Sequence, residues 1–237
     1  KHYQTKYPLN TLLDIFLKVC DAVKYAHSQG ILHLDLKPAN IQLGSFGEVL
    51  ICDWGLAKVL GQAEGNFDCL SFSPDLLNNM PMTGEIKGTP GYMAPEQILA
   101  GGENCYATDI YALGATLYSL LTYNKAFEGD TKTILHNTRR GNVKLPSECS
   151  PHLDISKNLE VIISTAMAKE PQKRYSTVTE LRREIQHFLN GKANQAERPS
   201  LLKKTKLFYK RHLLFSNVLS ALLGALTLVS GFLSHKL

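Results

Sequence analysis

The sequence HLDLKPAN occupies residues 33–40, and the tripeptide DWG follows at residues 53–55. The first stretch places a carboxylate at Asp35, a cation at Lys37 and an amide at Asn40 in one short, proline-containing loop. Transfer of a phosphoryl group to a hydroxyl requires a base for the hydroxyl proton and cations that balance the phosphoryl charge. This combination of residue types therefore predicts a phosphoryl-transfer site.

The two stretches are expected to supply different parts of that site. Asp35 is the candidate base, and Lys37 is the candidate clamp on the transferred phosphoryl group. Mg²⁺ keeps several waters and takes only one or two carboxylates besides phosphate oxygens. Asp53 and the amide oxygen of Asn40 are therefore sufficient protein ligands, and Mg²⁺ is the predicted metal. The alternative, that Asp35 is only a turn former, leaves the accompanying lysine and asparagine unexplained.

Further motifs follow in an order that resembles the eukaryotic-type serine/threonine protein kinases, whose H-R-D-L-x-x-x-N and D-F-G motifs carry these roles. Residues 88–96 (GTPGYMAPE) resemble the end of an activation segment, and residues 109–114 (DIYALG) resemble the start of the central buried helix. Residues 169–175 (KEPQKRY) contain the arginine that pairs with the APE glutamate. Lys37 and Thr89 favour serine/threonine specificity, and Thr89 is expected to bridge the base and the lysine rather than to be a simple turn residue.

The resemblance implies ATP as the phosphoryl donor beside Mg²⁺, and it also implies supporting roles for residues outside the chemistry. His33 and Trp54 are expected to pack beneath the site. Asp109 is expected to be a buried carboxylate that accepts backbone N–H groups of the catalytic loop. Glu96 and Arg174 are expected to form a buried ion pair that ties the activation segment to the lobe, and such a pair is costly to break at one end.

Three departures from the family pattern qualify the expected activity. Leu34 replaces the arginine that usually neutralises an activation-segment phosphate, so regulation by that phosphate is not expected. Gln42 stands where the family places an apolar residue under the adenine ring. Residues 1–32 contain no glycine-rich loop, lysine strand or partner-glutamate helix, so the chain is expected to be a fragment without the N-terminal lobe and inactive alone. The alternative function is a membrane-tethered pseudokinase or scaffold; a purely structural membrane anchor would need none of the site residues.

The stretch GSFGEV at residues 44–49 resembles part of a glycine-rich phosphate-binding loop. It lies between the base and the metal aspartate, so the sequence favours a turn between two short strands, 41–43 and 49–52. This hairpin would hold Asn40 and Asp53 at a common ion.

The remaining pattern predicts a mainly α fold, the C-terminal lobe of a protein kinase, over residues 1–190. Apolar residues at helical spacing predict a helix over 10–29, with Asn10 as its cap and Gly30 as its stop. Residues 56–87 form a long segment rich in turn formers. Further helices are predicted at 94–99, 106–122, 130–140, 156–168 and 177–190.

The cysteines and the charge distribution limit the other classes of function. The five cysteines lack C-x-x-C spacing, which favours reduced thiols over a disulfide framework or a zinc site; they are Cys20, Cys52, Cys69, Cys105 and Cys149. The net charge of +5 is local, because residues 203–211 carry five cations and no acid, whereas residues 1–202 are near neutral. A nucleic-acid partner is therefore not expected.

The basic run belongs to a linker and juxtamembrane segment at 191–212, which precedes 21 residues without a charge at 213–233. That length spans the hydrocarbon core of a bilayer as one helix, and a buried core helix is the disfavoured alternative. The positive-inside rule places the kinase lobe in the cytoplasm of a single-pass protein of the cell membrane. This arrangement resembles bacterial membrane-anchored receptor-type kinases. A stripe of small residues would allow a homodimer through the span, although ordinary lipid-facing residues are the favoured interpretation; its members are Ser216, Ser220 and Gly224.

Overall fold

The computed structural model describes residues 7–60, 88–99 and 102–191. The chain divides into two compact units between residues 186 and 187, and the first unit contains residues 33–40 and the elements that surround them. None of the helices in the described ranges has both the length and the apolar character needed to cross a bilayer. The predicted membrane span at 213–233 and its stripe of small residues lie outside those ranges, as does most of the predicted linker.

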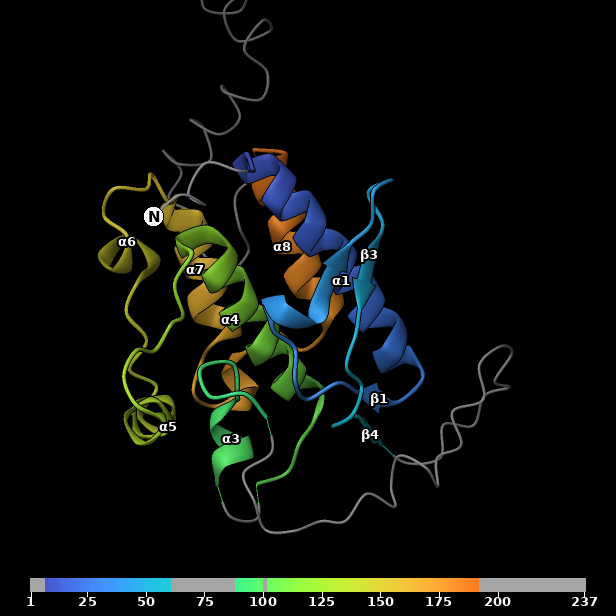
Figure 1. Ribbon diagram of the computed structural model, residues 1–237, viewed down its shortest axis with the longest axis vertical. Helices are drawn as coiled ribbons and strands as arrows, with labels where there is room; N and C mark the ends of the chain where they lie inside the picture. The colour runs from blue at the N-terminus through green and yellow to red at the C-terminus, as the bar shows by residue number, and fades with distance from the viewer. Residues whose placement is uncertain (1–6, 61–87, 100–101, 192–237) are drawn as a thin grey trace, which may run out of the picture. The chain divides into compact units, whose positions relative to one another are not determined.

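A buried helix, α4 (Tyr106–Thr122), lies at the centre of the lobe. It packs against α1 (Leu9–Ser28) and α7 (Lys157–Ala166), and Figure 1 shows α1 and α4 running through the middle of the fold. A Cβ atom added at Gly114 of α4 would lie 2.8 Å from side-chain atoms of Ala166 and Met167. Only a glycine therefore allows α4 and the end of α7 to approach this closely. The bounds predicted for α4 are confirmed.

Helix α1 buries the stripe that its sequence predicts. Its apolar residues at helical spacing are buried, including Leu13, Phe16 and Val23 at 0% exposure. The helix ends before Gly30, whose φ of +72° is the left-handed conformation that glycine adopts at low cost after a helix. The predicted cap at its start is wrong, because Pro8 precedes the first turn and Asn10 lies inside the helix.

The strands form two small antiparallel pairs in the described residues. Strand β2 (Ile41–Leu43) pairs with β3 (Val49–Ile51), so the predicted hairpin is confirmed. Its turn is closed by the Gly44 N–H, which donates to the Glu48 carbonyl at 2.9 Å. The glycine-containing stretch is thus a turn and not a phosphate loop. Strand β1 (Ile31–Leu32) pairs with β4 (Lys58–Val59), which was not predicted.

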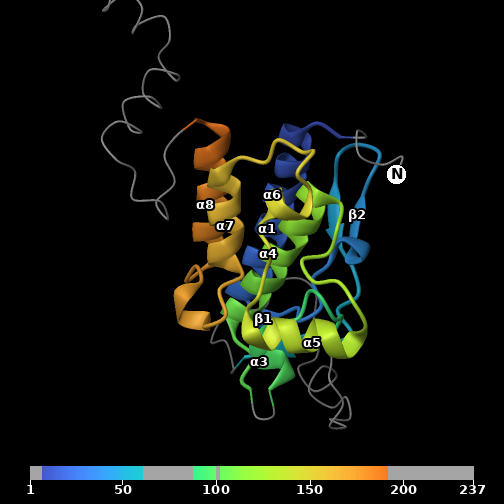
Figure 2. The same ribbon diagram turned by 90° about the vertical axis from the view of Figure 1, so that its left-hand side faces the viewer.

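Shorter helices cover one end of the lobe. Figure 2 shows α5 (Thr131–Arg140) lying crosswise to α4 and next to α3 (Pro95–Ile98). Asp130 caps α5 by accepting the Thr133 N–H at 2.8 Å. The other elements are α6 (Pro146–Cys149), α8 (Val178–Leu189) and two 3₁₀ turns at Pro38–Asn40 and Pro171–Lys173. The described part of the chain is therefore mainly α, as predicted.

Candidate active site

The backbone of the catalytic loop is fixed by one buried carboxylate. Asp109, at 0% exposure, accepts the N–H groups of His33 at 2.9 Å and Leu34 at 2.8 Å. The ring of His27 lies 2.8 Å from the same carboxylate. Leu34 has a φ of +64°, a conformation that a leucine holds only when its surroundings enforce it. The structural role predicted for Asp109 is confirmed, and it explains how the strained loop is held.

Three side chains from two distant segments form a closed triangle around the candidate base. Lys37 Nζ lies 2.6 Å from Asp35 Oδ2 and 2.7 Å from Thr89 Oγ1. The Thr89 hydroxyl in turn donates to Asp35 Oδ1 at 2.7 Å. The predicted bridge by Thr89 therefore exists in this structure. It fixes both oxygens of the carboxylate and brings the end of the activation segment to the base.

Asn40 completes this arrangement from the 3₁₀ turn that follows the loop. Its amide nitrogen donates to the backbone oxygen of Asp35 at 2.9 Å and approaches Asp35 Oδ2 at 3.3 Å. Because the nitrogen is used in this way, the amide oxygen points away from Asp35. That oxygen is the atom required of a magnesium ligand.

Asp53 is held beside Asn40 by the hairpin. The Cys52 N–H donates to the Asn40 backbone oxygen at 2.8 Å, so the next residue emerges next to Asn40. Asp53 is exposed, with a φ of +63°. A carboxylate and an amide oxygen fit Mg²⁺, which needs few protein ligands. In the described ranges no group of three or more His, Cys, Asp or Glu side chains forms a denser metal site.

His33 and Trp54 pack beneath the site, as predicted. Their ring centroids lie 4.4 Å apart. Burial lowers the pKa of His33, which keeps its ring neutral, so the ring can both accept and donate hydrogen bonds. The Asp35 N–H donates to His33 Nδ1 at 3.3 Å, and His33 Nε2 lies 3.2 Å from the Cys52 carbonyl oxygen. The imidazole therefore connects the base loop to the metal segment.

Glu96 and Arg174 form the expected buried ion pair. The two guanidinium nitrogens Nη1 and Nη2 each donate to one carboxylate oxygen at 2.7 Å, a bidentate geometry. Thr108 donates to the same carboxylate at 2.9 Å, and the guanidinium lies 5.0 Å from the Tyr111 ring centroid. The other guanidinium donors bind the backbone oxygens of Ala107, Ala168 and Lys169.

Gln97 is a site residue that sequence reasoning missed. Its Oε1 accepts the Ala94 N–H at 2.8 Å, and its Nε2 donates to the Leu34 carbonyl oxygen at 3.0 Å. The amide therefore ties α3 to the catalytic loop at the position where the family arginine is replaced. A glutamine two residues after the proline that opens a helix is a capping signal, but its second partner depends on the tertiary fold.

The described cysteines are free thiols, and Cys52 contributes to the site through its backbone N–H and carbonyl groups. Cys20 is buried, and burial raises the pKa of its thiol. Cys52, Cys105 and Cys149 are partly exposed free thiols, and Cys69 lies outside the described residues.

Comparison with known proteins identifies the family. The protein kinase domain matches residues 2–187. The chain is 41% identical over 194 residues to the serine/threonine-protein kinase PknD of Chlamydia pneumoniae, an alignment that covers 81% of this chain and 20% of that protein. It is 40% identical to PknD of Chlamydia trachomatis serovar D over 217 residues, 89% of this chain and 23% of that protein. PknD of Protochlamydia amoebophila is 40% identical over 185 residues, 77% of this chain and 19% of that protein. The chain thus spans about a fifth of the length of these curated relatives, and it belongs to the protein kinase family.

Proposed function

We propose that the full-length protein is a serine/threonine kinase that transfers the γ-phosphoryl group of ATP to protein hydroxyls. The observation that carries this proposal is the closed triangle of Asp35, Lys37 and Thr89, together with Asn40, whose amide nitrogen binds the Asp35 backbone oxygen. A purely structural cluster has no need of a fixed carboxylate beside a cation and two oxygen ligands. The names of the relatives, all serine/threonine kinases, support the same activity.

In the proposed reaction each side chain has its own part. Asp35 accepts the proton of the substrate hydroxyl, whose oxygen bonds to the γ-phosphorus as the bond to the leaving ADP oxygen breaks. Lys37 balances the charge that develops on the transferred group. Asn40 and Asp53 would hold Mg²⁺, which supplies charge neutralisation and orientation of the phosphates. Thr89 keeps the Asp35 carboxylate turned toward the acceptor.

Activity in this protein is proposed to be independent of an activation-segment phosphate. Leu34 is buried and carries no charge that could bind a phosphate. Hydrogen bonds of Thr89 and Gln97 tie the end of the activation segment to the catalytic loop instead. Thr89 accepts from Lys37 and donates to Asp35, and Gln97 donates to the Leu34 carbonyl oxygen. The rival proposal, a pseudokinase or scaffold, draws on Leu34 and on Gln42, which is exposed on β2. The intact triangle favours catalysis.

The test is incubation of the purified full-length protein with γ-labelled ATP and Mg²⁺, with and without a generic basic protein substrate. We expect label on phosphoserine or phosphothreonine, and we expect EDTA to abolish it. Absence of transfer with both Mg²⁺ and Mn²⁺, while the protein still binds partners, would favour the pseudokinase. Label confined to tyrosine would contradict the specificity.

We further propose that residues 213–233 anchor the protein in the cell membrane as a single-pass helix, with the kinase lobe in the cytoplasm. The support is 21 residues without a charge that follow a run of five cations. Ser216, Ser220 and Gly224 would then offer a face for a homodimer. The protein is expected to stay in the membrane pellet after alkaline carbonate extraction, and a chain ending at residue 212 is expected to be released. Release of both would contradict the anchor.

A further inference from the structure

Lys125 lies over the segment that leads from Thr89, a hydrogen-bond partner of the candidate base, to α3. A Cβ atom added at Gly91 would lie 3.5 Å from Lys125 Cδ, so the lysine stem covers this glycine. Gly91 follows two residues after Thr89, whose hydroxyl donates to Asp35. Two residues of chain span at most about 7 Å. The stem of Lys125 is therefore close to the place where an acceptor hydroxyl must sit.

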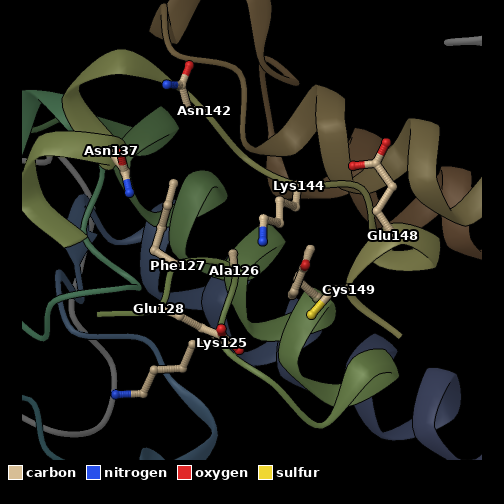
Figure 3. Close-up of a pocket in the computed structure, with 10 residues that line it drawn as sticks. Lys125, Ala126, Phe127, Glu128, Asn137, Asn142, Lys144, Glu148 and Cys149 are labelled. Atoms are coloured by element: carbon tan, nitrogen blue, oxygen red, sulfur yellow. The ribbon is translucent and has the colours of Figure 1, made fainter. Parts of the chain in front are cut away.

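The ammonium group of Lys125 has no acidic partner in the described ranges. The side chain is exposed, and none of the ion pairs found there includes it. Lys125 stands at the edge of a polar hollow that is also lined by Glu128, Lys144, Glu148 and Cys149. Figure 3 shows that its ammonium group extends away from Lys144 and from the other side of this hollow.

The segment on which the Lys125 stem lies, residues 89–92, contains no acidic residue. The Tyr92 hydroxyl lies 3.3 Å from the Ser119 hydroxyl, so this contact involves no carboxylate. Glu128 and Glu148 line the same hollow as Lys125, and neither makes an ion pair with it. Lys125 is therefore an exposed cation without an ion pair, and its stem lies against the segment that follows Thr89.

We propose that Lys125 selects substrates that carry an aspartate or glutamate within a few residues of the phosphorylated serine or threonine. This inference rests on the proposed kinase function. An extended peptide advances about 3.3 Å per residue. A carboxylate two or three positions from the phosphorylated residue therefore lies about as far from the acceptor hydroxyl as Gly91 lies from Thr89. At that distance the Lys125 ammonium can pair with it. A basic substrate residue at the same place would be repelled.

The test measures kcat/KM of the full-length protein on peptides that carry Asp, Ala or Arg at each position flanking one serine. At low salt we expect the best acidic peptide to exceed its alanine counterpart by about three- to fivefold, the range of an exposed ion pair. This preference should shrink as salt is raised. Lys125→Gln keeps most of the stem over Gly91 and should abolish the preference. Lys125→Glu should turn it toward the arginine peptide.

Lys144→Glu is the matched control, because it makes the same change of charge in the lining of the same hollow. It should leave the peptide preference as in the wild type. A wild-type enzyme that phosphorylates the alanine peptide without any acidic preference would overturn the inference and leave the proposed function standing. An equal effect of Lys144→Glu and Lys125→Glu would also overturn it. Failure to phosphorylate every peptide would overturn the proposed function and this inference together.

Discussion

The Asp35→Asn variant of the full-length protein is expected to lose roughly 10²- to 10⁴-fold in kcat, the range for removal of a general base. The amide has the shape of the carboxylate, but it cannot accept the proton of the substrate hydroxyl. Lys37 and Thr89 each donate to a different oxygen of Asp35, and the amide replaces one of these two acceptors by a donor. The fold should persist, because the loop backbone is held independently by Asp109.

Steady-state transfer at saturating ATP measures this effect, with thermal unfolding as the check on folding. Asp14→Asn is the matched control, because Asp14 is an exposed aspartate on α1 and takes no part in the site. It should keep the wild-type kcat. A wild-type rate in Asp35→Asn would remove Asp35 from the role of base.

The Arg174→Met variant is expected to lose about 3–5 kcal/mol of unfolding free energy, the cost of leaving a buried charge unpaired. Glu96 is 8% exposed and would keep Thr108 as its only remaining side-chain donor among the described contacts. The backbone oxygens that Arg174 binds would also lose their donor. Denaturant unfolding of the purified protein measures the loss.

Arg182→Met is the control for this prediction, because Arg182 also pairs with a carboxylate, that of Asp21, at 2.7 Å. Asp21 is 51% exposed, so this pair is expected to contribute at most about 1 kcal/mol. The double variant Glu96→Gln with Arg174→Met should lose less unfolding free energy than the sum of the losses in the two single variants, because it leaves no buried charge. Equal losses in Arg174→Met and Arg182→Met would contradict the role of the buried pair.

The parts of the site that could be predicted are those that local sequence determines. Asp35, Lys37 and Asn40 occur within six residues, so one short loop must bring them together whatever surrounds it. The hydrophobic pattern likewise indicated α4, because most residues of this helix are apolar and its middle, residues 108–118, is buried. The motif order then indicated that Thr89 and Asp109 would meet this loop, which the distances confirm.

The features that were missed depend on contacts between distant segments. Strands β1 and β4 contain two residues each, too few for an alternating pattern to be detected. Gln97 and Lys125 are ordinary polar residues in the sequence, and their importance comes from lying over Leu34 and Gly91. The positive φ of Leu34 was also hidden, because leucine does not predict a left-handed conformation and the side chains that bind its backbone, Asp109 and Gln97, lie far away in the sequence.

The most direct test measures single-turnover phosphoryl transfer from bound Mg·ATP by the full-length protein. Nucleotide affinity is determined on the same samples. Together the two measurements separate the role of Asp35 in the chemical step from that of Asp53 in metal binding. Asp35→Asn should bind Mg·ATP as the wild type does and fail to transfer the phosphoryl group. Asp53→Asn should lose the Mg²⁺-dependent part of the nucleotide affinity. Transfer by Asp35→Asn at the wild-type rate would contradict the assignment of Asp35 as the base.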